Sequence, residues 1–160
     1  MKEIKMSKDT VNLIDRRVIE ANALIPVIRA FGERIGLDGA KAVVQKTHEN
    51  MSRQYGRACA EEKGSNILAD LAEVISSWAK GGALEIAVIE LTNTSYIFNV
   101  TRCRYAEKYR KMGMAEFGHC LSCCRDEPFA KGFNPKIRFE RSQTIMEGAS
   151  FCDFKFFLDT

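Results

Sequence analysis

Thiols and carboxylates in the second half of the sequence could do chemistry, and Cys103 is the first of them along the chain. It lies in the segment 99–107 after a predicted strand, where we expect Thr101 to cap the following helix. Helix N–H groups, the helix dipole and the flanking Arg102 and Arg104 would all favour a thiolate. Cys103 is therefore a candidate reactive cysteine. The same geometry could bind a substrate carboxylate, or Cys103 could simply be a small buried residue.

A cysteine-rich segment, His119-Cys120-Leu-Ser-Cys123-Cys124-Arg125-Asp126, is the second candidate. The pair Cys120-x-x-Cys123 could hold zinc or another divalent metal, but a tetrahedral site needs further ligands from elsewhere in the chain. We therefore assign no metal ligands and predict no cofactor. Asp126 is the better candidate for acid–base chemistry if it is buried beside the sheet, and a surface aspartate is the alternative.

The end of the chain is predicted to form two strands joined by a turn at Glu147-Gly148. In the first of these strands, Arg141 could hold a carboxylate and Thr144 could donate its hydroxyl.

Alternation along the last strand puts Cys152 on the aromatic face and Asp153 on the opposite face. Both can line one surface only if a bulge intervenes. We expect Asp153, not Cys152, to meet the ligand, with Cys103 and Asp126 as its neighbours.

Size and composition indicate one globular domain over residues 1–160, with a helical part at 1–80 and a second part at 83–160. The net charge of +3 and the lack of a Lys/Arg block argue against a nucleic-acid partner. The N-terminus lacks the apolar stretch of a signal peptide, and no apolar run is long enough to span a membrane. We expect a soluble cytoplasmic protein without a membrane partner, in which the six cysteines are free thiols.

The elements that position these groups follow from the apolar spacing. Helical spacing predicts three helices in the first part, at about 7–36 with Ser7 as its N-cap, 38–63 and 65–79 with Ser65 as its cap. Alternation then predicts a hairpin around Thr92-Asn93-Thr94, followed by helices at about 102–112 and 115–131, a strand at 136–145 and the last strand.

This order predicts an α+β fold. The N-terminal helices pack on one face of a four-stranded antiparallel sheet, which is made of two hairpins separated by two helices. Spare apolar surface on the first two helices could form a homodimer.

Several segments together resemble the L-2-amino-thiazoline-4-carboxylic acid hydrolase family: Asn99–Arg110, Cys124–Asp126, Gly132–Pro135, Arg141–Gly148 and Cys152–Lys155. They occur in the family's order and cover the larger, C-terminal part of the chain. The resemblance implies a hydrolase that opens the ring of 2-amino-thiazoline-4-carboxylate with water. The product would be a carbamoyl-cysteine on a route to L-cysteine.

Water must add to the amidine-like C2 of this small carboxylate substrate, and the ring sulfur must leave. The groups that could start the reaction are Asp126 or Asp153 as a general base, or Cys103 as a nucleophile. The groups that could bind the substrate are Arg102 or Arg141 at its carboxylate and Asn99 or Thr144 at its ring nitrogens.

Two other functions remain open. The ending Gly148…Cys152-Asp-Phe is similar to vinyl-reductase-type ligand-binding domains, which would make the chain a non-catalytic small-molecule-binding module. The cysteine-rich segment could instead form a metal or redox sensor. Metal analysis tests the sensor, and turnover of the thiazoline separates an enzyme from a binding module.

Overall fold

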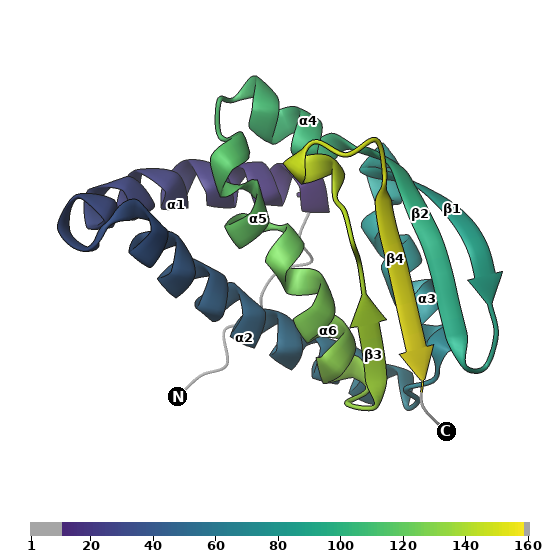
Figure 1. Ribbon diagram of the computed structural model, residues 1–160. Helices are drawn as coiled ribbons and strands as arrows, with labels where there is room; N and C mark the ends of the chain where they lie inside the picture. Colours follow the sequence, from purple (N-terminus) through teal and green to yellow (C-terminus); the bar gives the residue numbers. More distant parts are fainter. Residues whose placement is uncertain (1–10, 159–160) are drawn as a thin grey trace.

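The computed structural model describes residues 11–158, which form a helical layer on one face of an antiparallel sheet (Figure 1). The first part of the chain contains α1 (Leu13–Ile35), α2 (Leu37–Lys63) and α3 (Leu68–Trp78). Helices α1 and α2 form a long antiparallel pair that turns at Gly36, whose φ of 82° suits a residue without a side chain. None of the helices in residues 11–158 is long and apolar enough to cross a membrane.

The N-terminal caps differ from the sequence-based expectation. Helix α1 begins at Leu13, where the Asn12 side chain accepts a hydrogen bond from the Asp15 N–H at 2.9 Å. The predicted cap Ser7 lies outside the described residues. Ser65 does not cap α3, because the chain stays extended through Ile67 before the helix begins.

The four strands are β1 (Leu84–Leu91), β2 (Ser95–Cys103), β3 (Ile137–Glu140) and β4 (Cys152–Leu158), in the order β1-β2-β4-β3. All neighbouring strands are antiparallel, so the predicted α+β class with a four-stranded antiparallel sheet is confirmed. Strands β1 and β2 form the predicted tight hairpin.

The second hairpin is looser than predicted, because β3 ends at Glu140 rather than near residue 145. Its connection to β4 contains a short 3-10 helix, Ile145–Glu147. Backbone N–H groups of Ser142 and Gln143 bond the Asp153 carboxylate, and Thr144 caps the 3-10 helix. These side-chain hydrogen bonds replace the strand pairing that alternation alone predicts.

The middle of the chain contains α4 (Arg104–Lys111), α5 (Gly118–Leu121) and α6 (Asp126–Phe133), with 3-10 turns at Ala115–Phe117 and Cys123–Arg125. The single helix predicted over 115–131 is therefore wrong. Pro128 has no N–H to donate and its ring would clash with the preceding turn, which disfavours a continuous helix at this position. A new helix starts at Asp126 instead, with Pro128 in its first turn.

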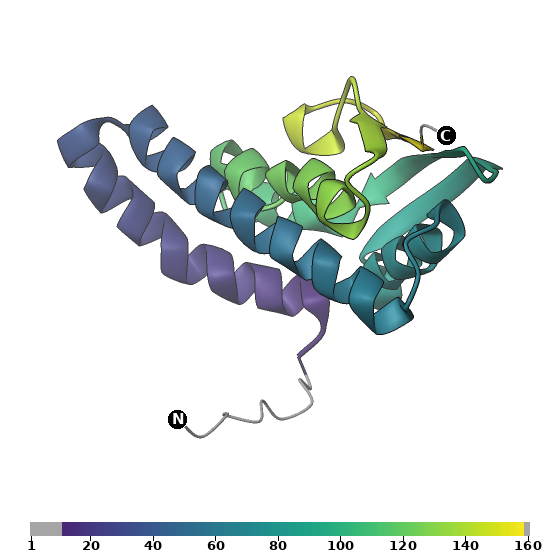
Figure 2. The same ribbon diagram turned by 90° about the horizontal axis from the view of Figure 1, so that it is seen from below.

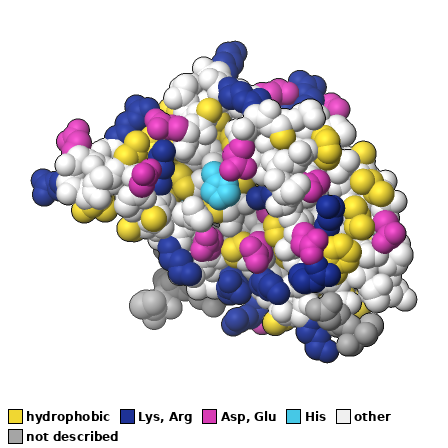
Figure 3. Space-filling view, in the orientation of Figure 1, with side chains coloured by type: hydrophobic (Ala, Val, Ile, Leu, Met, Phe, Trp, Pro, Cys, Tyr) yellow, Lys and Arg dark blue, Asp and Glu magenta, His cyan; other side chains and the backbone are white. Residues whose placement is uncertain are grey.

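Helices cover the face of the sheet that carries the aromatic side chains. Phe98 on β2 and Phe154 on β4 stack with ring centroids 4.8 Å apart, and both are buried. The opposite face is mixed: it carries Asn99, Asp153 and Lys155 together with Ile97 and Phe157. Acidic and basic side chains are mixed over the surface seen in Figure 3.

Two glycines set how closely α6 approaches α2. A Cβ atom on Gly56 would overlap the Phe129 carbonyl oxygen, and one on Gly132 would overlap the Arg53 carbonyl oxygen. The two helices therefore pack backbone to backbone, side by side in Figure 2. This contact fixes the position of α6, whose first residue is Asp126.

Candidate active site

A cavity of about 420 Å³ lies between the aromatic face of the sheet and helices α1, α2 and α6. Its walls are mainly apolar. The thiols, acids and bases that line it are Cys103, Cys123, Cys152, Asp126 and Arg141 around the sheet, and Arg16, Arg17, Glu20 and Arg125 on the helical side. A largely apolar pocket with a few converging polar groups is the usual form of a small-molecule site.

A β-bulge brings Cys103 into this cavity. In the pairing of β1 with β2, Glu85 lies opposite Arg102 and Ile86 lies opposite Val100, so Thr101 is the extra residue. The bulge turns Arg102 outward and places Cys103 on the same face as Val100, where both line the cavity. The expectation that Thr101 caps the next helix is wrong, because β2 continues to Cys103.

Asp126 and Arg141 form an ion pair at the cavity. The Arg141 guanidinium donates to the Asp126 carboxylate at 2.5 Å and to the Cys123 carbonyl oxygen at 3.0 Å. The guanidinium carbon also lies 5.0 Å from the Phe154 ring centroid, within the range of a cation–π contact. The Asp126 and Arg141 side chains are 18% and 9% exposed, so the pair is mostly removed from solvent.

Burial dominates the ionisation of these groups. It raises the pKa of Asp126 above its usual value, and the positive charge of Arg141 only partly opposes this. Burial also raises the pKa of the Cys103 thiol to about 11, although the N–H groups of Ala106 and Tyr105 favour the thiolate. The pKa of Cys152 is raised by burial as well.

The thiolate predicted at Cys103 is therefore not favoured in this structure. Arg102 forms its ion pairs with Glu107 and Glu85, and Arg104 donates to the Gly81 carbonyl oxygen at 3.2 Å. Cys103 thus lacks the cationic neighbours that the sequence indicated. A protonated thiol could donate a proton to a leaving group rather than act as a ready nucleophile.

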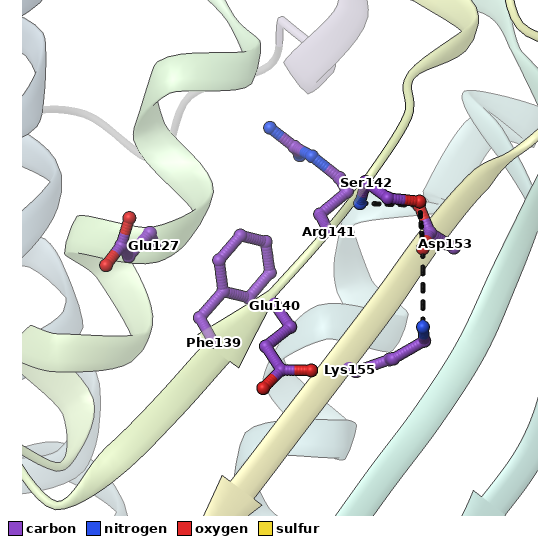
Figure 4. Close-up of a pocket in the computed structure, with 7 residues that line it drawn as sticks. All are labelled: Glu127, Phe139, Glu140, Arg141, Ser142, Asp153 and Lys155. Atoms are coloured by element: carbon purple, nitrogen blue, oxygen red, sulfur yellow. Dashed lines mark hydrogen bonds and ion pairs between the residues drawn. The ribbon is translucent and has the colours of Figure 1, made fainter.

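Asp153 lies on the other face of β4, as alternation predicted, and it borders a shallow pocket that Ser142 and Lys155 also line (Figure 4). Its carboxylate accepts hydrogen bonds from the Ser142 N–H at 2.9 Å, the Ser142 hydroxyl at 2.8 Å and the Gln143 N–H at 2.9 Å. Burial alone would raise the pKa of Asp153, but these bonds outweigh it and the pKa is lowered. Asp153 does not line the cavity that contains Cys103 and Asp126, contrary to the expectation that these residues are neighbours, whereas Arg141 lines both pockets.

The remaining predicted binding residues also lie away from the cavity lining. Asn99 pairs with Asp153 across β2 and β4 and shares its face of the sheet. Arg102 is half exposed at the surface. The Thr144 hydroxyl donates to the Glu147 carboxylate at 2.6 Å and accepts from the Glu147 N–H at 3.1 Å, so it serves as a helix cap. Of the seven predicted site residues, the structure gathers Cys103, Asp126 and Arg141 around the cavity.

Sequence reasoning missed several cavity residues. Cys152 faces the cavity although Asp153 was preferred, and Cys123 joins it from the 3-10 turn before α6. Phe129 could have been found, because it follows Asp126 by three residues and therefore shares its helix face. Tyr105 also lines the cavity. Its buried hydroxyl has no hydrogen-bond partner among residues 11–158.

The cysteine-rich segment does not converge on a metal site in this part of the chain. Across residues 11–158, no group of three or more His, Cys, Asp or Glu side chains is arranged to hold a metal ion. Cys120 and Cys124 donate their S–H groups to the carbonyl oxygens of Phe117 and Cys120, at 3.3 and 3.2 Å. All six cysteines are free thiols.

Together the fold and the cavity define an α+β protein in which two carboxylates, four guanidinium groups and three thiols line one mainly apolar pocket. The sequence model of the L-2-amino-thiazoline-4-carboxylic acid hydrolases matches residues 16–156, and the chain belongs to this family. Comparison with curated proteins finds no significant match.

A solved structure with a similar fold is that of trafficking protein particle complex subunit 3 from Naegleria fowleri, covalently bound to palmitic acid. The similarity has a TM-score of 0.53 and 11% sequence identity, and it covers 92% of this chain and 96% of the other. At this identity the comparison establishes a shared fold.

Proposed function

We propose that this chain opens the ring of 2-amino-thiazoline-4-carboxylate, or of a related small cyclic amidine, with water to give a carbamoyl-cysteine. Membership of the hydrolase family supports the reaction class. The observation that carries the proposal is the buried pair of Asp126 and Arg141 at a cavity of small-molecule size. A general base and an anion-binding group are the two functions that this reaction needs most.

In this mechanism Asp126 activates the water. Its raised pKa makes it a stronger base than an ordinary aspartate, and it is held at the cavity wall by Arg141. The water oxygen bonds to C2 of the ring and the bond between C2 and sulfur breaks. One water proton passes through Asp126 to the sulfur and the other goes to the ring nitrogen, so the product is a urea with a free thiol.

Arg141 holds the substrate carboxylate. Its guanidinium carries five N–H donors in a planar fork, so it can bond Asp126 and a second carboxylate together. Cys103 remains protonated at neutral pH because its pKa is about 11. It relays the proton to the leaving sulfur: it donates its S–H proton to that sulfur and takes up the water proton that Asp126 has accepted. A direct attack by Cys103 on C2 is the alternative first step.

Ring opening by purified Asp126→Asn, Cys103→Ser and Asp153→Asn variants tests these roles. We expect Asp126→Asn to lower kcat by about a hundredfold or more, the usual contribution of a general base. Asp153→Asn is the matched control, because Asp153 lies on the opposite face of the sheet. Near-normal rates in both the Asp126 and the Cys103 variants would contradict the mechanism.

A second candidate function is a non-catalytic binding domain. The mainly apolar lining favours it, and the protein of similar fold from Naegleria fowleri is described as covalently bound to palmitic acid. A binding domain would show a thermal shift with the thiazoline and give no product. Mass spectrometry of the intact purified chain would also reveal any covalent adduct.

A further inference from the structure

The cavity is larger than the proposed small heterocycle requires. Its volume of about 420 Å³ falls in the range of pockets that enclose drug-sized ligands. A five-membered ring with one carboxylate and one amino group, held between Asp126 and Arg141, would leave much of this space to water. Water against apolar walls makes few hydrogen bonds, and displacing it with an apolar group is favourable.

The space beyond Asp126 is bounded by three aromatic side chains, which we call the aromatic wall: Tyr55, Trp78 and Phe129. The Phe129 ring centroid lies 5.1 Å from that of Trp78 and 5.8 Å from that of Tyr55. Phe129 is one helical turn from Asp126, so the Cβ atoms of these two residues lie about 5–6 Å apart. Tyr55 is 60% exposed, so the wall extends from the reaction centre toward solvent.

Polar groups near the wall already have protein partners. The Ser52 hydroxyl donates to the Arg125 carbonyl oxygen at 2.7 Å, and the Ser77 hydroxyl donates to the Val74 carbonyl oxygen at 2.6 Å. Arg17 is paired with Glu20 at 2.6 Å. Arg16 also lines the cavity close to Tyr55, so a ligand at this end meets mainly apolar surface next to the Arg16 guanidinium.

We propose that the natural substrate is a 2-amino-thiazoline-4-carboxylate that carries an apolar group on its exocyclic nitrogen, and that this group packs on the aromatic wall. The inference rests on the proposed hydrolase function and specifies its substrate class. The exocyclic nitrogen is bonded to C2, the atom that water attacks beside Asp126. A ring or branched chain attached there reaches Phe129, whereas Arg141 holds the carboxylate at the other side of the heterocycle.

The test compares two probes, 2-amino-thiazoline-4-carboxylate and its N-benzyl derivative, on the full chain. We expect kcat/KM to be at least about tenfold higher for the N-benzyl compound, since even one methylene in an apolar pocket changes the rate by about that factor. Tyr55→Ala should lower kcat/KM for the N-benzyl compound by about fivefold, through loss of an aromatic contact, and should change that of the parent compound less. Because Tyr55 is largely exposed, this variant should fold.

Phe31→Ala is the matched control, because Phe31 is 55% exposed and does not line the cavity. It should alter neither rate. Equal kcat/KM for the two probes, or an equal effect of Tyr55→Ala on both, would overturn the inference and leave the hydrolase function standing.

Calorimetric binding of the same probes separates the two proposals. If neither probe is opened but the N-benzyl compound binds more tightly than the parent, the ligand class is supported and the hydrolase function fails. Absence of both turnover and binding preference would overturn both.

Discussion

The Asp126 carboxylate and the Arg141 guanidinium lie 2.5 Å apart because α6 and β3 have matching lengths. Eight helical residues rise about 12 Å, and four strand residues span about 13 Å. The chain reverses at Asn134, which donates to the Asn66 carbonyl oxygen and accepts from the Lys136 N–H, both at 3.0 Å. The start of the helix and the residue after the strand therefore meet.

The first prediction concerns the pH dependence of turnover. A general base must be ionised, so kcat/KM should rise with pH through the raised pKa of Asp126. Arg141→Met removes the positive charge that lowers this pKa, and the acid limb of the profile should move to higher pH. Arg138→Met, a change at a half-exposed arginine outside the cavity, should not move it. An acid limb at the same pH in the Arg141 variant would contradict the role of Asp126.

The second prediction concerns the reactivity of Cys103. With a pKa of about 11, its thiol should be protonated at pH 7 and should react slowly with iodoacetamide. The rate should increase as pH rises toward 10, which peptide mapping by mass spectrometry can follow. Labelling in denaturant gives the rate of the exposed thiol for comparison. Rapid labelling of the folded chain at pH 7 would indicate a thiolate and favour nucleophilic catalysis.

The third prediction assigns Asp153 to stability. Asp153→Ala removes three hydrogen bonds to the connection before β4 and should lower the free energy of unfolding by about 2–4 kcal/mol. Asp153→Asn should cost less, because it keeps the oxygen atom that accepts both backbone N–H groups. Denaturant unfolding measures both values.

The same site should make stability depend on pH. The folded pKa of Asp153 is lowered, so its charge stabilises the fold above the ordinary aspartate pKa of about 4 and loses this effect as pH falls below it. The difference in stability between the natural chain and Asp153→Asn should therefore shrink in acid. A difference that stays constant down to pH 3 would contradict this assignment.

The fourth prediction concerns the contact between α2 and α6. Gly56→Ala should destabilise the chain by several kcal/mol, because the new methyl group would overlap the Phe129 backbone. Gly39→Ala on the same helix is the matched control, since its Cβ would have no neighbour closer than 3.7 Å. It should stabilise the chain by about 0.5–1 kcal/mol through helix propensity. Thermal unfolding of the two variants should therefore shift in opposite directions.

Periodicity in the sequence was enough to predict most of the architecture. Helical apolar spacing over about 7–36 predicted α1, in which Ile14, Ala21, Ile25 and Ile28 are buried. Alternation predicted that Cys152 and Asp153 lie on opposite faces, which the structure confirms. Both patterns are visible in the sequence because a single element fixes them.

The composition of the site depended on contacts that no single element fixes. The extra residue at Thr101 reverses which side chains at the end of β2 point toward the cavity and which point away from it. Strand alternation in the sequence cannot reveal this bulge, because the bulge arises from the pairing of β2 with β1. The ionisation of Cys103 also depends on how deeply the neighbouring layers bury it, which here outweighs the helix N–H groups.

The sequence by itself therefore determined the α+β class, the helical faces and the family to which the chain belongs. Only the tertiary structure decided which charged residues meet, because Asp126 and Arg141 are joined by the reversal of the chain between α6 and β3. It also decided that Asp153 holds a loop, because its hydrogen-bond partners come from the connection that precedes β4. Local sequence patterns indicate which way a side chain points, whereas the packing of distant segments determines which groups that side chain contacts.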